Sequence, residues 1–163
     1  MIFINIEIHN YLNKTEHQLN NPKFNNPIEF AEWTYEKAKI NFNTTFPNFP
    51  IYNNFIYWCN LGINIGSEQN KIRPTLILRS FKQSPICTIL LLTSKRLQDK
   101  FQFHIDLENL NSTVLIEQIR VVSKLRFLNP YRLKGKLVTI SQNDWDKINI
   151  QLENLYRLRP FSK

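Results

Sequence analysis

Three short stretches of the sequence place polar side chains directly beside apolar, strand-like runs. GSEQNKIRP (residues 66–74) precedes TLIL, LLLTSK ends an apolar run at residues 90–95, and EQIR interrupts the run VLIEQIRVV. The polar residues are Glu68, Gln69, Lys71 and Arg73; Thr93, Ser94 and Lys95; Glu117, Gln118 and Arg120. A guanidinium can hold two phosphate oxygens at once, and a hydroxyl can donate to a third. Each cluster alone also fits an ordinary solvated loop or strand end.

The third cluster needs a specific environment. Polar side chains within an apolar strand must find partners if they are buried, so the sheet is expected to open there to water, a ligand or another subunit.

Other catalytic signatures are missing from the sequence. Its three histidines and two cysteines share no metal-ligand spacing, and no Gly-rich phosphate loop or Ser/His/Asp set can be assembled. His104 falls on a predicted strand, where a satisfied structural histidine is expected. We therefore predict neither a metal nor a cofactor.

The positive charge is unevenly distributed along the chain. Of the 163 residues, 21 are Lys or Arg and 13 are Asp or Glu, which gives a net charge of +8. Residues 71–136 alone hold 13 basic and 4 acidic residues. Such a local excess is typical of a protein that binds a polyanion, usually nucleic acid, although a generally basic surface gives the same count.

The second half of the chain reads as a sheet followed by a helix. Polar turns separate the apolar runs, which are Phe55–Leu61, Thr75–Arg79, Ile86–Leu92, Phe101–Leu107, Thr113–Val122 and Lys136–Ile140. Their spacing predicts an antiparallel sheet curled into a small barrel. Ser141 and Asp144 resemble a capping box, and Trp145, Ile148, Leu152 and Leu155 follow at helical spacing.

The first fifty residues lack the closely spaced apolar runs of the second half. Residues 1–25 are Asn-rich and weakly patterned, so we expect them to be loosely packed. Asn26 and Pro27 predict a helix start, and the spacing that follows extends this helix over residues 27–42. TTFPNFP then breaks the helix. We therefore predict an extension over residues 1–50, with one helix and a linker, and a barrel domain over residues 51–163.

No membrane segment or signal peptide is expected. The longest apolar run, ICTILLL, is far shorter than the ~20 residues of a membrane span, and the N-terminus has no basic region before its apolar residues. Cys59 and Cys87 lie in apolar surroundings and fit buried thiols of a cytoplasmic protein.

The order of the motifs resembles that of a known family. GSEQNKIRPTLIL, LLLTSK, STVLIEQIRVVSKLRF and a terminal amphipathic helix resemble the MazF/PemK (Kid) toxin endoribonucleases over roughly residues 55–158. The resemblance implies a small SH3-like β-barrel, a homodimer, and cleavage of single-stranded RNA without metal through the RNA 2′-hydroxyl. It also implies a cognate antitoxin, and contact with DNA only through the toxin–antitoxin complex that represses the operon.

The resemblance also implies roles for individual residues. Arg73 and Thr93 would be catalytic, and Glu68, Gln69 and Gln118 would hold RNA. Lys71, Ser94, Lys95 and Arg120 belong to the same clusters and are predicted to bind RNA with them. The general base stays open between Glu68 and, less conventionally, Arg73, although an arginine side chain stays protonated in proteins, which argues against that role.

The sequence departs from the family pattern in two places, and two other functions are also compatible with it. The family's Arg-Gly-Asp-like turn before the first strand is replaced by YNNFIYWCNLG, and the connection FKQSP is short. The same features also fit a non-catalytic SH3-like module that binds nucleic acid, or a CcdB-like poison of a topoisomerase. The Arg73–Thr93 pair favours the ribonuclease, because neither alternative needs both residues.

Overall fold

The computed structural model describes residues 2–23, 26–43 and 45–157, with side chains from Ile6 onward. The chain divides into two compact units, Met1–Phe42 and Asn43–Lys163. The predicted domain boundary after residue 50 stays a prediction. Within the described residues, no helix is both long enough and apolar enough to cross a membrane.

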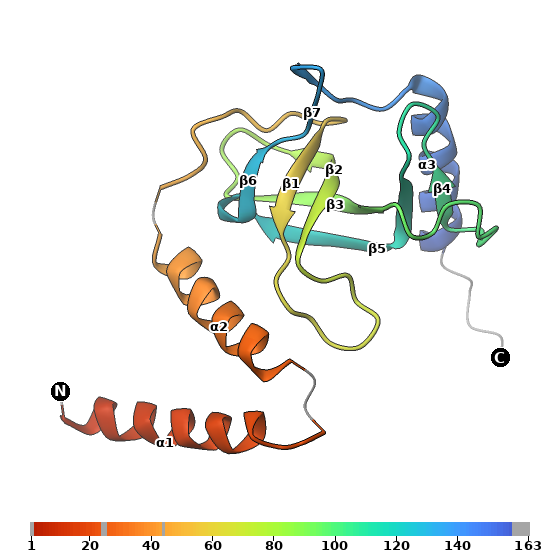
Figure 1. Ribbon diagram of the computed structural model, residues 1–163. Coiled ribbons are helices and arrows are strands. Elements are labelled where there is room, and N and C mark those ends of the chain that lie inside the picture. The colour runs from red at the N-terminus through yellow and green to blue at the C-terminus, as the bar shows by residue number, and fades with distance from the viewer. Residues whose placement is uncertain (1, 24–25, 44, 158–163) are drawn as a thin grey trace, which may run out of the picture. The chain divides into compact units, whose positions relative to one another are not determined.

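The first unit contains two helices, α1 (Ile2–Leu19) and α2 (Pro27–Phe42) (Figure 1). Helix α2 has the predicted bounds, and the Asn26 carbonyl accepts the Phe30 N–H at 3.2 Å. The sequence predicted one helix in the extension, and this number is wrong because residues 2–19 form a second helix, α1, whose described side chains are mostly exposed. Helix α1 was not predicted because its Ile and Asn residues have modest helix propensity and its apolar residues form no single stripe.

The second unit is built on a six-stranded antiparallel sheet with the order β4-β5-β3-β2-β1-β6. Figure 1 shows this sheet bending around itself. The strands are β1 (Ile56–Asn60), β2 (Ile72–Ser80), β3 (Ile86–Thr93), β4 (His104–Asp106), β5 (Thr113–Ser123) and β6 (Phe127–Pro130). Register shifts in β1, β2 and β3 bend the strands, because a bulge locally increases the twist. The predicted mainly β fold is therefore confirmed, although strand pairing does not close the sheet into a ring.

Some strand bounds differ from the predictions. Strand β6 was missed because FLNP is short and carries a proline. The predicted strand over residues 136–140 is reduced to β8 (Lys136–Leu137), which forms a separate hairpin with β7 (Arg132–Leu133). The predicted strand over residues 101–107 is only the three-residue β4.

Alternation along the strands builds a core on each face of the sheet. Ile56, Leu76 and Leu90 belong to one core, together with Ile148 of helix α3 (Gln142–Tyr156). Their chain neighbours, among them Tyr57 and Ile77, belong to the other core. Because successive strand side chains point to opposite faces, one register fixes both cores.

Helix α3 begins as the sequence predicts. The Ser141 Oγ accepts the Asp144 N–H at 3.0 Å, which satisfies one of the free amides of the first turn. Asp144 is itself buried and accepts the Glu108 N–H with both carboxylate oxygens, at 3.3 and 3.4 Å. The cap therefore also ties α3 to the loop after β4.

Candidate functional site

The loop between β1 and β2 is closed by backbone hydrogen bonds and shaped by asparagines. At its base the Lys71 N–H donates to the Gly62 carbonyl at 2.6 Å, and the Leu61 N–H donates to the Lys71 carbonyl at 2.9 Å. Inside the loop, the Asn64 N–H donates to Asn70 Oδ1 at 2.7 Å, and Asn64 Nδ2 donates to the Gln69 carbonyl at 2.8 Å. Asparagine side chains commonly replace backbone partners in this way. The loop is thus an ordered element.

Gln118 joins this loop to strand β5. Its Oε1 accepts the Gln69 N–H at 2.9 Å, and its Nε2 donates to the Ser67 carbonyl at 3.5 Å. These residues are 49 and 51 positions away in the chain. The first and third polar clusters of the sequence therefore meet through the side chain of Gln118.

An open groove of about 540 Å³ lies where the loop meets β5. It is lined by Ser67, Glu68, Glu117, Gln118, Ile119 and Arg120. Three of these, Glu68, Gln118 and Arg120, are residues that the sequence predicted to bind RNA. The groove offers carboxylate, carboxamide, hydroxyl and guanidinium groups around one apolar side chain.

Arg73 and Thr93 lie at the same end of two neighbouring antiparallel strands. Thr75 of β2 pairs with Leu91 of β3, and Arg73 and Thr93 each lie two residues beyond this pair, at the same end of the two strands. Arg73 Nε donates to the Asn70 carbonyl at 3.0 Å. Among the described residues, neither terminal nitrogen of Arg73 has a hydrogen-bond or salt-bridge partner. The Arg73 fork is thus held at one nitrogen and available at the other two.

The Thr93 side chain is held by a hydrogen bond from the backbone that follows it. It is buried, and its Oγ1 accepts the Lys95 N–H at 3.2 Å. Acceptance through the oxygen leaves the hydroxyl proton able to donate to a ligand.

Cys59 is a buried thiol on which two nearby arginine charges act. It pairs with Arg73 in the register of β1 and β2 and is fully buried. Burial raises the pKa of the Cys59 thiol to about 12, against the opposing effect of the nearby Arg126 and Arg120 guanidinium charges. Arg120 of β5 and Arg126 of the turn after β5 therefore lie near this buried thiol.

A carboxylate–histidine–carboxylate contact adjoins the groove, and the sequence did not predict it. His104 Nδ1 lies 2.6 Å from Asp99 Oδ2, and its Nε2 lies 3.2 Å from Glu117 Oε1. The His104 side chain is only 10% exposed. His104 is thus satisfied, as expected, but one of its partners lines the groove. Only the interruption of an apolar strand by Glu117 hinted at this contact.

The remaining residues that were predicted to bind RNA do not line the groove. Ser94 and Lys95 are exposed after the end of β3, and neither lines the groove. Lys71 is exposed, with a positive φ of 70°, and its backbone closes the loop. Within the described part of the chain, no three His, Cys, Asp or Glu side chains are grouped to hold a metal ion.

Residues 54–156 match the family model of the PemK-like, MazF-like toxin of type II toxin–antitoxin systems. Endoribonuclease EndoA of Bacillus subtilis is 25% identical over 107 residues, which cover 60% of this chain and 87% of that protein. Endoribonuclease MazF of Staphylococcus saprophyticus is 30% identical over 103 residues, which cover 58% and 81%.

Solved structures share the fold. The crystal structure of MazF (Form-I) from Deinococcus radiodurans aligns with a TM-score of 0.56 at 17% identity, covering 68% of this chain and all of that one. The MazE–MazF structure (Form-II) from the same organism aligns with a TM-score of 0.53 at 17% identity, covering 69% of this chain and all of that one.

Proposed function

Because the chain belongs to the PemK-like, MazF-like family of type II toxin–antitoxin toxins, we propose that it cleaves single-stranded RNA without a metal ion. In this reaction the 2′-hydroxyl of the RNA attacks the adjacent phosphate, the bond to the 5′-oxygen breaks, and a cyclic phosphate remains. The attack places additional negative charge on the phosphate oxygens.

Arg73 and Thr93 are proposed to stabilise that charge. The two terminal nitrogens of Arg73 would donate to two phosphate oxygens, and the Thr93 hydroxyl would donate to the same phosphate. The observation that supports this most strongly is their position at the same end of β2 and β3, with Arg73 oriented by Asn70. Donors fixed before the reaction need not be reoriented when the charge develops.

The groove beside β5 is proposed to bind the RNA. Glu68, Gln69 and Gln118 would contact bases, and Arg120 with Lys71, Ser94 and Lys95 would contact the backbone. Glu68 and Glu117, the two carboxylates that line the groove, are proposed as candidates for the general base, and Glu68→Gln and Glu117→Gln distinguish between them.

Two partner proteins belong to the proposal. The first is a cognate antitoxin, which is supported by the likeness to the MazE–MazF structure from Deinococcus radiodurans; DNA would be contacted only through that complex. The second is another copy of this chain in a homodimer, expected from the apolar strands and from the resemblance. Sedimentation at micromolar concentration tests the homodimer, and a monomer there would contradict it.

The deciding experiment incubates the purified protein with a long RNA in EDTA and maps the cut ends. We expect cuts at a short recurring sequence, with a cyclic phosphate on the upstream fragment. RNA binding without cuts would favour the non-catalytic module. Neither binding nor cuts, together with inhibition of a topoisomerase, would favour the poison.

A further inference from the structure

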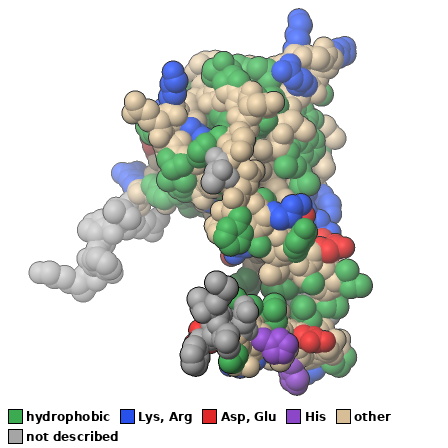
Figure 2. All heavy atoms as spheres, turned by 90° about the vertical axis from the view of Figure 1, so that its left-hand side faces the viewer, with side chains coloured by type: hydrophobic (Ala, Val, Ile, Leu, Met, Phe, Trp, Pro, Cys, Tyr) green, Lys and Arg blue, Asp and Glu red, His purple; other side chains and the backbone are tan. Residues whose placement is uncertain are grey.

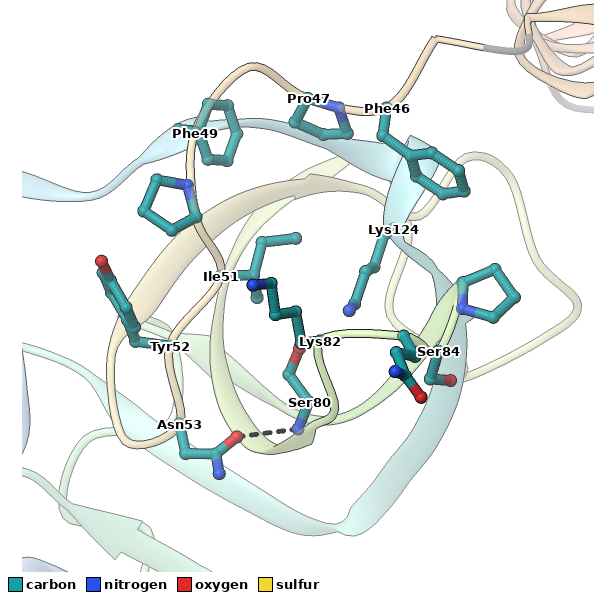
Figure 3. Close-up of a pocket in the computed structure, with 13 residues that line it drawn as sticks. Phe46, Pro47, Phe49, Ile51, Tyr52, Asn53, Ser80, Lys82, Ser84 and Lys124 are labelled. Atoms are coloured by element: carbon teal, nitrogen blue, oxygen red, sulfur yellow. Dashed lines mark hydrogen bonds between the residues drawn. The ribbon is translucent and has the colours of Figure 1, made fainter.

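A hollow of the second unit has a lining different from that of the groove. It measures about 980 Å³ and is formed by the linker at residues 46–53, the β2–β3 turn at residues 80–85, and Lys124. Figure 3 shows side chains from the linker along one side and the lysines Lys82 and Lys124 reaching toward the middle. The whole linker part precedes residue 54, where the match to the toxin family begins.

The wall made by the linker is anchored to the core. Tyr57 is fully buried, and its hydroxyl donates to the Pro50 carbonyl and accepts the Tyr52 N–H, both at 3.0 Å. The Phe49 ring stacks on the Tyr57 ring at 6.0 Å with an interplanar angle of 16°. The linker is therefore a fixed wall, although its sequence indicates only a connection between domains.

Aromatic surface remains available beside this wall. Phe46 and Tyr52 line the hollow and are each 49% exposed. Figure 2 shows hydrophobic side chains at the surface of the 43–163 unit, with lysines and arginines among them. Half-exposed aromatic rings have faces on which a flat ring of a ligand can stack.

The charge of the lining has one sign. Lys82 and Lys124 line the hollow, and no Asp or Glu is among the described residues that do so. Lys124 Nζ donates to the Phe81 carbonyl at 2.6 Å, which fixes its position, and Lys82 is exposed. Exposed aromatic rings combined with unopposed cations are the chemistry with which proteins hold single-stranded nucleic acid. An acidic peptide would satisfy the lysines, but it would leave the ring faces without planar partners unless it were also aromatic.

The groove and the hollow are lined by residues that lie close together in the chain, at the end of β5 and just after it. Arg120 lines the groove and Lys124 lines the hollow, and the step of four residues from one to the other spans at most about 13 Å of extended chain. One RNA strand can therefore reach both, because single-strand sites commonly cover about 4–16 nucleotides.

We propose that this hollow is a second RNA-binding site, which holds nucleotides flanking the segment that lies in the groove. The site rests on the proposed function, since it takes the same RNA, and it extends the RNA contact beyond the reacting phosphate. Bases stack on Phe46 and Tyr52, and Lys82 and Lys124 attract the phosphates.

The test measures affinity for two RNAs, both carrying a 2′-deoxy nucleotide at the mapped cut site so that neither is cleaved. One has about four nucleotides and the other about twelve, the range of typical single-strand sites. The variants are Phe46→Ala, Tyr52→Ala and Lys82→Glu. Lys136→Glu is the control, because it makes the same charge change at an exposed position outside the hollow. Circular dichroism checks the folding of every variant.

We expect each ring variant to weaken binding of the long RNA by at least about five-fold, the loss of one stacked base, and to leave the short RNA unaffected. Lys82→Glu should weaken the long RNA more than Lys136→Glu does. Equal losses on both RNAs, or no loss on either, would overturn the second site. Unchanged RNA binding with weakened binding of an acidic aromatic peptide would assign the hollow to a protein partner instead.

The two proposals can fail separately. If the wild type cuts no RNA, affinity is measured with a short and a long oligouridine instead. The comparison of variants then still tests whether the hollow binds RNA. If the wild type cuts RNA and the ring variants bind the long RNA normally, only the second site is lost.

Discussion

At the scale of single residues, the chemistry depends on how Arg73 is held. Its Nε donates to the Asn70 carbonyl at 3.0 Å, which fixes one corner of the guanidinium. A planar fork held at one corner can bind two oxygens in a defined geometry, whereas an ammonium is a single point of charge. The identity of the side chain should therefore matter more than its charge.

Arg73→Lys is expected to retain most RNA affinity and to lose cleavage. Loss of a contact made in the transition state costs about 3–4 kcal/mol, or a rate decrease of about 100- to 1,000-fold. Single-turnover cleavage and equilibrium binding measure the two effects. The control is Arg79→Lys, which makes the same replacement at an exposed position near the other end of β2. Full activity of a folded Arg73→Lys protein would remove this residue from the mechanism.

The two cysteines are expected to be inert in the folded protein. Burial raises the pKa of Cys59 to about 12 and that of Cys87 to about 11, and the reactive form is the thiolate. Iodoacetamide at about pH 8 should therefore modify neither thiol in the native protein and both thiols in urea. Mass spectrometry counts the adducts, and rapid modification of the native protein would show that the core opens.

At the scale of elements, the sequence predicted what depends on local pattern. The bounds of α2 and the start of α3 were predicted because caps and apolar stripes are local, and the main strands were found from their apolar runs. The groove could not be found in this way. It forms because Gln118 reaches a loop 49 residues away, and spacing along the chain carries no record of that contact. The contact of His104 with Glu117 was missed for the same reason.

The Gln118 contact is expected to order the β1–β2 loop. Gln118→Leu removes both hydrogen bonds and should lower the free energy of unfolding by about 1 kcal/mol per bond. The Gln69 amide, which donates to Gln118, should exchange with solvent faster. Hydrogen exchange measures this, and Gln102→Leu is an exposed control. Unchanged protection of Gln69 would mean that the loop orders itself.

Hydrogen bonds between Glu108 and the start of α3 should make the stability of the fold depend on pH. Glu108 accepts hydrogen bonds from Asn143, from Ser141 at 2.9 Å and from Lys147 at 3.3 Å, and these bonds, that from Asn143 first, lower the pKa of Glu108 below its ordinary value of 4.5. A lowered pKa contributes stability that is present above 4.5 and is lost as the pH falls through the folded-state pKa.

Glu108→Gln should therefore reduce the midpoint of thermal unfolding at neutral pH, and the difference from wild type should shrink as the pH falls below 4.5. Thermal unfolding at several pH values measures this. Glu153→Gln, at an exposed position of α3, is the control. A difference that is constant with pH would show that the carboxylate charge plays no part.

At the scale of the whole molecule, the two units should behave independently. A chain that starts at Asn43 keeps the linker residues Phe49 and Ile51, which pack against the sheet, and is expected to fold and cut RNA as the full chain does. A chain that starts at Tyr52 lacks both residues and should unfold at a lower temperature. Circular dichroism and RNA cleavage compare the three chains. A folded but inactive Asn43 chain would place part of the first unit in the site.

The edges of the sheet decide how copies of this protein can meet. Pairing leaves β4 and β6 as the edge strands of the six-stranded sheet, so each has one side without a strand partner in it. Both strands are poor templates, since β4 has three residues and β6 has four and ends in Pro130. Short edges and proline discourage strand-to-strand aggregation. The open sheet therefore does not favour fibrous growth, and any association of two copies is expected to use side chains rather than an extension of the sheet.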